Sequence, residues 1–262
     1  MASPKNRSTT RAQWAAGALA LGVFLVGGCT RGPGPDGPSA RGQEDVAALG
    51  GFSYDAEEIP GVKPWSHEDF ADDPAEFQFA ILGDRGGGAN TEGTYRRAIQ
   101  QLNLLRPEFV MSVGDYVEGY TTDPEEMDAQ WDEFDAIIAE LDVPFFYVRG
   151  NHDINMPLTR EAWDERRGPK YYHFRYQDVL FVALDTEDAE RPMPPNMEED
   201  VATYNRLKKE DPQAAMAFIV EWMQTPEAKE AFGHGARVEF PEEQRSWFKR
   251  VLEENQDVRW TF

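Results

Sequence analysis

The sequence has 262 residues, with 48 Asp and Glu against 26 Lys and Arg, and therefore a formal net charge of −22. A protein that binds nucleic-acid backbones needs a clustered positive surface to displace counterions, so we expect no nucleic-acid partner. Hydrophobic residues make up 40% and aromatic residues 12% of the chain, which is enough for a sizeable core and disfavours a wholly disordered protein. We expect one globular domain with attachments.

The N-terminal segment has the pattern of a secretory signal. Residues 1–28 hold three basic residues and no acidic one, and their apolar stretch, 14–26, is short for a bilayer span. The end of this segment, Val26-Gly27-Gly28-Cys29, resembles the lipobox of bacterial lipoproteins, in which the cysteine is acylated and becomes the first residue. We expect lipidation at Cys29, because the only cysteine of the chain falls at the cleavage point. The alternative is an ordinary signal peptide with an incidental thiol.

The segments that follow indicate a tethered protein. Residues 29–50 are rich in Gly and Pro and predict a tether, and residues 51–76 predict an extended lead-in that packs partly on the domain. A single cysteine excludes a disulfide within the chain and a Cys-based zinc site. We expect an extracytoplasmic protein, in the periplasm or at the cell surface, held on a bacterial membrane by its lipid anchor.

From residue 77 onward, apolar runs alternate with amphipathic segments. The pattern predicts strands over 77–82, 109–113 and 143–148, a helix over 91–105 capped by Asn90 or Thr91, and a helix over 124–141. This alternation predicts an α/β fold of βαβ units with a parallel sheet. A hairpin over 171–176 and 179–184 makes the sheet mixed, and a helix over 241–254 and a strand from 258 follow.

A helical excursion interrupts this order at about 186–235. It begins with several prolines and continues with an apolar pattern of helical period. Two interpretations stay open: a lid or partner surface, or a helical flap that only covers a sheet edge.

Each of the first three predicted strands ends in a glycine followed at once by polar residues. The three ends read Gly83-Asp84, Gly114-Asp115 and Gly150-Asn151-His152-Asp153. Glycine permits an abrupt turn, and the carboxyl ends of strands in open α/β sheets form the ligand crevice. Carboxylate, carboxamide and imidazole groups that converge there predict a site for hard or borderline divalent metal ions.

These motifs, in this order and spacing, resemble those of the calcineurin-like metallophosphoesterases over residues 77–262. The resemblance implies an αββα sandwich of mixed sheets. It also implies hydrolysis of phosphomonoesters or phosphodiesters by metal-bound hydroxide at a binuclear centre. Two cations that share a bridging carboxylate lie within about 4 Å of each other and clamp the phosphoryl oxygens for in-line attack. Oxygen and imidazole ligands suit Mn, Fe and Zn alike.

The resemblance also assigns roles to individual residues. Asp84 would bind the first metal ion, Asp115 would bridge both ions, and Asn151 would bind the second. His152 would donate a proton to the leaving group, and Asp153 would hold its ring.

Arg85, beside the first of these residues, is a candidate for contact with the substrate phosphate. The alternative is that Arg85 offsets local negative charge or pairs with Glu92.

The sequence departs from the family pattern in three places. Gly86 stands where many members have a His ligand, and Glu118 stands where purple acid phosphatases have a Tyr. The later histidine motifs of the family would follow the strand that begins at Val258, whereas this sequence ends at Phe262. We therefore expect a domain that is incomplete at its C-terminus, in a native chain that continues.

These departures support an alternative function, a non-catalytic, membrane-tethered binding lipoprotein that retains the phosphoesterase fold. Under the first hypothesis the partners are a phosphate-ester substrate and, through the lipid anchor, a membrane. No obligate protein partner is evident from the sequence.

Overall fold

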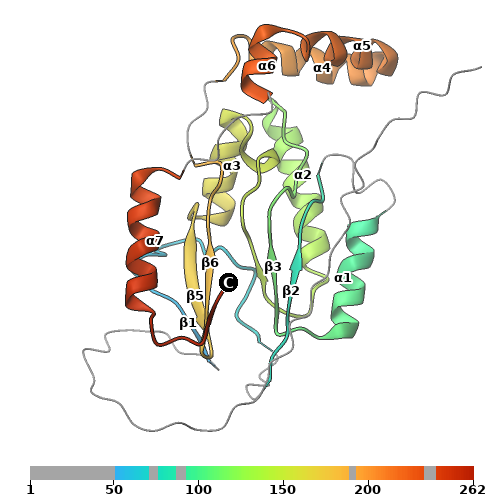
Figure 1. Ribbon diagram of the computed structural model, residues 1–262. Coiled ribbons are helices and arrows are strands. Elements are labelled where there is room, and N and C mark those ends of the chain that lie inside the picture. Colours follow the sequence, from blue (N-terminus) through green and yellow to red (C-terminus); the bar gives the residue numbers. More distant parts are fainter. Residues whose placement is uncertain (1–50, 71–75, 87–92, 189–192, 233–239) are drawn as a thin grey trace, which may run out of the picture.

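A computed structural model describes residues 51–70, 76–86, 93–188, 193–232 and 240–262. The expected signal peptide (1–28) and the expected lipidated Cys29 with its tether (29–50) lie outside these residues. In the described part, two sheets pack face to face and helices cover both outer faces, as Figure 1 shows. The fold is α/β, as the sequence pattern predicts, with the αββα layers that the family resemblance implies.

The first sheet is wholly parallel and contains β2 (Phe79–Leu82), β3 (Phe109–Ser112) and β4 (Phe145–Phe146), in that order. Two helices connect these strands and cover the outer face of the sheet: α1 (Thr94–Leu105) and α2 (Pro124–Ile138) (Figure 1). The predicted βαβ units are therefore confirmed. Gly93 takes the N-cap position of α1, and the predicted caps Asn90 and Thr91 lie outside the described residues.

The second sheet contains β1 (Phe52–Ser53), β5 (Tyr172–Tyr176), β6 (Val179–Ala183) and β7 (Trp260–Thr261), in the order β1-β5-β6-β7. The predicted hairpin, β5 and β6, belongs to this mixed sheet, so the expectation that it joins the parallel strands is wrong. Along β5, buried and half-buried residues alternate, as in a strand with one face on the core. α7 (Glu242–Glu254) covers the outer face of this sheet (Figure 1).

Aromatic side chains fill the space between the two sheets. Phe79 and Phe109 of the first sheet meet Phe181 of the second with ring centroids 5.0 Å apart in both pairs. Phe146 stacks on Phe174 with centroids 4.1 Å apart and an interplanar angle of 15°. The opposite face of the first sheet packs on α1 and α2, so its strands are buried on both faces. This explains why they are continuous apolar runs in the sequence.

The lead-in is part of the core. β1 pairs antiparallel with β5, and the side chains of Phe52 and Trp65 are buried in the aromatic layer between the sheets. The described residues of this segment therefore contribute both a strand and buried side chains to the sandwich.

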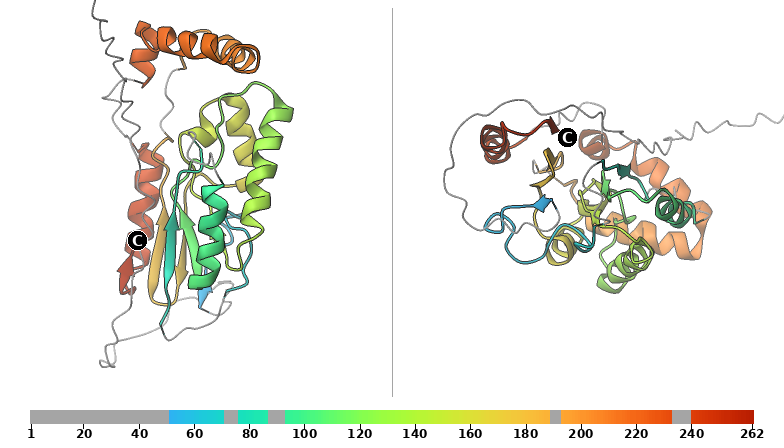
Figure 2. Two further views of the ribbon diagram at one scale, coloured as in Figure 1. Left: turned by 90° about the vertical axis from the view of Figure 1, so that its right-hand side faces the viewer. Right: turned by 90° about the horizontal axis from the view of Figure 1, so that it is seen from below.

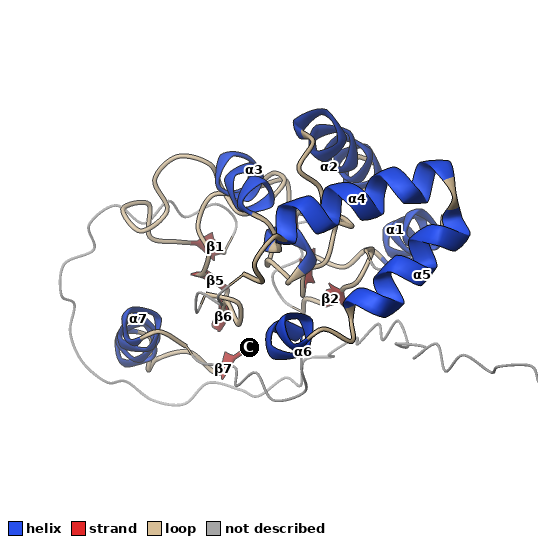
Figure 3. Cartoon of the chain, turned by 90° about the horizontal axis from the view of Figure 1, so that it is seen from above, coloured by secondary structure: helices blue, strands red, loops and turns tan. Residues whose placement is uncertain are grey.

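Besides α7, the part of the chain that the structure describes has four α-helices after the third strand of the parallel sheet. α3 (Pro157–Arg167), which the sequence analysis missed, packs beside α2. The predicted excursion forms α4 (Met197–Glu210), α5 (Pro212–Trp222) and α6 (Pro226–Phe232). These three helices, the helical cap, lie across one end of the sandwich, as Figures 2 and 3 show. Among the described residues, no helix combines the length and apolar character that a membrane crossing requires.

The burial of Phe52 gives a test of the role of the lead-in. Phe52→Ala removes a ring that is 1% exposed, and we expect it to lower the free energy of unfolding by about 3–5 kcal/mol. Leu104→Ala, at a side chain that is 83% exposed, serves as the control and is expected to change it by less than about 0.5 kcal/mol. Urea unfolding measures both, and equal effects would contradict a core role for the lead-in.

Candidate metal centre

The three strand-end motifs meet at the carboxyl edge of the parallel sheet, on the side that faces the helical cap (Figure 1). The Asp84 N–H donates to the Gly114 carbonyl oxygen (3.1 Å), which joins the turns after β2 and β3. The His152 N–H donates to Oδ1 of Asp115 (3.0 Å), which joins the turn after β3 to the loop that follows β4. The structure therefore brings the predicted residues together.

Two glycines allow the turns to approach so closely. Gly114 has φ of +99°, and a Cβ atom there would collide with the backbone of Gly150. A Cβ atom at Gly150 would in turn collide with the side chain of Asp115. Any larger residue at either position would force the two turns apart.

The buried side chain of Asp153 connects these turns. Its carboxyl group is fully buried. Its Oδ1 accepts hydrogen bonds from the N–H groups of Tyr116 (2.8 Å) and Val117 (3.4 Å), and its Oδ2 accepts from those of Asp115 (2.9 Å) and Gly150 (2.8 Å). Burial raises the pKa of Asp153 to about 7, against the opposing effect of the hydrogen bonds from Gly150 and Tyr116. One side chain thus fixes the turns that carry the other candidate residues.

Asp84 and Asp115 form a pair of adjacent carboxyl groups. Both residues have left-handed backbone conformations, with φ of 50° and 62°. Non-glycine residues in this region are strained by about 1–3 kcal/mol and cluster at functional sites. The pKa of Asp84 is raised, first by burial and then by the neighbouring charge of Asp115 and a hydrogen bond to its side chain. The fold therefore holds two acidic groups together although they repel each other when ionised.

The chemistry of this pair fits a divalent cation. Carboxylate oxygens are preferred ligands of hard cations, and a cation would remove the repulsion between Asp84 and Asp115. Asn151, exposed on the adjoining loop, offers an amide oxygen. Among the described residues, however, no group of three or more His, Cys, Asp or Glu side chains is arranged to hold a metal ion. The described donors fit a first ion and are too few for two.

The structure corrects the predicted partner of His152. Nδ1 of His152 lies 2.9 Å from the Glu118 carbonyl oxygen, whereas both oxygens of Asp153 accept from backbone N–H groups. Asp153 is the last residue of the motif, but the short 3₁₀ helix over His152–Ile154 directs it to the protein interior. The expectation that Asp153 holds the ring is therefore wrong, and the Glu118 carbonyl occupies that position.

Arg85 also differs from its predicted role in phosphate binding. Its side chain is buried, donates from Nη1 to the Tyr116 carbonyl oxygen (2.8 Å) and forms an ion pair with Glu133 of α2 (2.7 Å). Arg85 is therefore turned toward the protein, where it ties two turns to a helix. This matches the alternative of local charge pairing, with Glu133 as the partner, while Glu92 lies outside the described residues.

Gly86 has a steric reason to be glycine. A Cβ atom there would lie 2.5 Å from the Val117 carbonyl oxygen, and the Gly86 N–H donates to the Asp115 carbonyl oxygen (2.7 Å). A histidine at this position would require the turn after β3 to move.

A buried ion pair near the same edge escaped the sequence analysis. Arg149, which precedes the Gly150 turn, donates from Nε to Oδ2 of Asp185 (2.7 Å), and both side chains are buried. Gln244 of α7 accepts from the Asp185 N–H (3.0 Å) and donates to its carbonyl oxygen (3.0 Å). The network joins the segments that follow β4 and β6 to α7. Its only signal in the sequence was a charged residue directly after each of two apolar runs.

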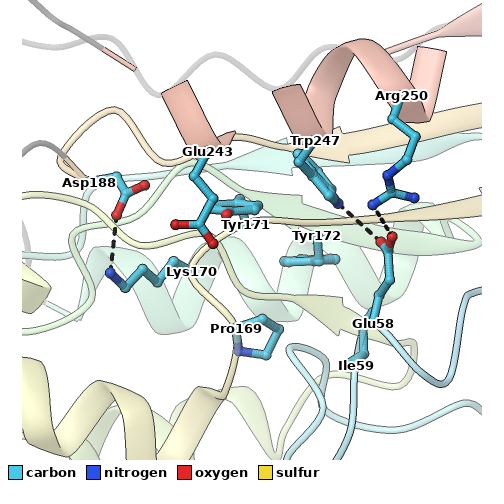
Figure 4. A pocket seen from close by; sticks show the side chains of 10 residues that line it. All are labelled: Glu58, Ile59, Pro169, Lys170, Tyr171, Tyr172, Asp188, Glu243, Trp247 and Arg250. Atoms are coloured by element: carbon cyan, nitrogen blue, oxygen red, sulfur yellow. Dashed lines mark hydrogen bonds and ion pairs between the residues drawn. The ribbon is translucent and has the colours of Figure 1, made fainter. Parts of the chain in front are cut away.

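A cavity of about 380 Å³ lies between the lead-in, the start of β5 and α7, and Figure 4 shows its walls. Glu58 accepts a hydrogen bond from Trp247 Nε1 (3.0 Å) and pairs with Arg250. Lys170 pairs with Asp188 (3.1 Å). These interactions tie the lead-in and the loop after β6 to their neighbours, so we assign this cavity a structural role.

Comparison with known proteins identifies the family of this domain. The family model "Calcineurin-like phosphoesterase" matches residues 77–256. The serine/threonine-protein phosphatase CPPED1 of Pongo abelii is 30% identical over 103 residues, which are 37% of this chain and 32% of that relative. The match thus spans about a third of the curated relative. A solved dimetal phosphatase from Danio rerio aligns with a TM-score of 0.48 and 18% identity, over 71% of this chain and 68% of that structure.

The contacts of Asp153 generate a prediction on stability. Asp153→Asn replaces one acceptor oxygen by an amide donor that faces two N–H groups. We expect this to lower the free energy of unfolding by about 2–4 kcal/mol and to speed amide hydrogen exchange at Tyr116 and Gly150. Asp164→Asn, at an exposed residue of α3, is the control. Unchanged stability and exchange in the Asp153 variant would mean that its carboxylate does not hold the turns.

Proposed function

We propose that this chain, which belongs to the calcineurin-like phosphoesterase family, hydrolyses phosphomonoesters or phosphodiesters with the help of two divalent metal ions. The proposal rests on one observation, the adjacent carboxyl groups of Asp84 and Asp115 at the sheet edge where Asn151 and His152 also lie. The proposed activity concerns the whole protein, whose further ligands would come from outside the described residues.

The proposed ligands divide between the two ions. Asp84 would hold the first ion, Asp115 would lie between both, and Asn151 would hold the second. Bound Mn, Fe or Zn would supply positive charge that polarises the phosphoryl group and lowers the pKa of a water molecule. Two of these residues are held by hydrogen bonds: the Asp84 N–H donates to the Gly114 carbonyl oxygen, and Asp115 Oδ1 accepts from the His152 N–H.

His152 is the proposed proton donor to the leaving group. A carbonyl oxygen only accepts hydrogen bonds, so the contact with Glu118 keeps a proton on Nδ1. In the imidazolium form Nε2 carries the second proton, and this proton would pass to the departing alkoxide and leave a neutral ring with its proton on Nδ1.

A second candidate function is a binding lipoprotein that keeps the fold without catalysis. It is favoured by the incomplete ligand set of the described residues and by the tight packing at Gly86. In either case we propose that the protein is lipid-anchored at Cys29 on the outer side of a bacterial membrane. We expect the native protein, extracted from membranes, to have an intact mass that lacks residues 1–28 and includes acyl chains. A mass without acyl chains would contradict the anchor.

Asp115→Ala tests the metal centre in the full-length protein. We expect it to abolish stoichiometric Mn²⁺ uptake in calorimetric titration and to lower Mn²⁺-dependent hydrolysis of p-nitrophenyl phosphate and bis(p-nitrophenyl) phosphate by about a hundredfold or more. The Asp164→Asn control should match the wild type. Full turnover in the Asp115 variant would exclude the proposed centre. If the wild-type protein neither binds Mn²⁺ nor hydrolyses either ester, that result would favour the binding-lipoprotein function.

The same assay separates His152 from the metal ligands. We expect His152→Gln to retain Mn²⁺ uptake and to slow hydrolysis of alkyl phosphates by about 10²–10⁴-fold, because an alkoxide needs a proton to leave. p-Nitrophenyl phosphate should be affected far less, since p-nitrophenolate leaves without one. An equal loss for both leaving groups would contradict the role as proton donor.

A further inference from the structure

An apolar cavity of about 570 Å³ lies between the helical cap and the turn that follows β3. On the cap side it is lined by aromatic, aliphatic and thioether side chains: Met197, Tyr204, Phe218, Ile219, Trp222 and Met223. Its size falls in the range of about 300–1,000 Å³ that is usual for small-molecule sites. The cap therefore encloses enough space for a sizeable organic group.

The opposite wall of the cavity is the turn that positions His152. Glu118, Gly119 and Tyr120 line the cavity, and the carbonyl oxygen of the first of them contacts Nδ1 of His152. The Tyr120 ring meets the His152 ring edge to face, with centroids 5.5 Å apart and an interplanar angle of 87°. The cavity thus adjoins the group that we propose to protonate the leaving group.

Several polar residues that line the cavity form hydrogen bonds with other residues of its walls. Asn205 donates from Nδ2 to the Tyr120 carbonyl oxygen (2.8 Å), and Gln130 accepts from the Gly119 N–H (3.0 Å). Trp222 donates from Nε1 to Oδ2 of Asp200 (2.8 Å), which joins α5 to α4. The charged residues Glu126 and Lys208 also line the cavity, but the surface left for a ligand is mainly apolar.

The cap is packed against the domain next to this cavity. Met156, which follows the loop of His152, is buried together with Met197 and Val201 of α4. Tyr120 and Trp222 pack against the same cluster. Figure 3 shows α4 and α5 side by side above the sandwich. The described cap is thus a fixed wall of the cavity.

We propose that this cavity binds the apolar part of the leaving group of the substrate, which makes the preferred substrates phosphoesters of alcohols with a long alkyl chain or a ring system. The proposal rests on the proposed function, since it places the phosphate at the Asp84 and Asp115 edge and the ester oxygen near His152. The organic group then reaches past Tyr120 into the space beneath the cap.

The experiment compares n-octyl phosphate with methyl phosphate, using the full-length protein with Mn²⁺ and measuring the phosphate released. The two esters have leaving groups of similar basicity and differ in apolar surface. Burial of the octyl chain should lower KM by about tenfold or more relative to methyl phosphate, with a similar kcat. Calorimetric titration of the metal-free protein gives a second readout, in which only octyl phosphate should bind measurably.

Variants of the cap identify the cavity as the site. Phe218→Ala and Met223→Ala remove lining side chains, and each should raise KM for octyl phosphate by about fivefold while leaving methyl phosphate unchanged. Met216→Ala is the matched control, because this methionine of α5 is 54% exposed and does not line the cavity. If Phe218→Ala disturbs the packing of the cap, the comparison of Met223→Ala with Met216→Ala still tests the cavity.

The outcomes separate the two proposals. Hydrolysis of both esters with equal KM, or an octyl preference that neither lining variant changes, would overturn the assignment of the cavity and leave the proposed function intact. Octyl-selective calorimetric binding without hydrolysis of either ester would overturn the proposed function and retain the cavity as a binding site for apolar phosphates.

Discussion

The geometry of the candidate site depends on a single buried carboxyl group. Asp153 accepts backbone hydrogen bonds from the turn after β3 and from Gly150, so the segments that carry Asp115 and His152 are fixed to the same two oxygen atoms. Neither segment can shift without breaking contacts that have no water to replace them. The site is thus held in position by a residue whose own side chain is fully buried.

The packed sandwich offsets the cost of this arrangement. Left-handed aspartates, adjacent carboxyl groups and a fully buried Asp153 are each unfavourable when taken alone. The stacked rings of Phe146 and Phe174 and the other aromatic contacts between the sheets supply stability some distance from the chemistry. These unfavourable features lie at one edge of the parallel sheet, and the well-packed core of the sandwich compensates for them.

Local patterns in the sequence were sufficient for the parts of the fold that obey local rules. The apolar spacing of α2 and the glycines after the first strands are short-range signals, and the structure confirms both. Except for Gly150, the partners of Asp153 lie more than thirty residues away in the chain, as do those of Arg85, so no local pattern could identify them. The same holds for β1, whose two residues become a strand only by pairing with β5.

The turn over Glu118–Tyr120 connects the chemistry of the site to its selectivity. Under the proposed function, the metal ions held by Asp84 and Asp115 would act on the phosphoryl group, which all phosphoesters share, and so they would distinguish substrates poorly. The part that differs between substrates is the alcohol, which in our proposal would depart on the side where His152 lies. Because the same turn contacts the His152 ring and lines the cavity under the cap, an alcohol held in that cavity has its ester oxygen near the imidazole. Binding of the organic group in the cavity would thereby place the ester oxygen beside the proton that His152 donates to the leaving alkoxide.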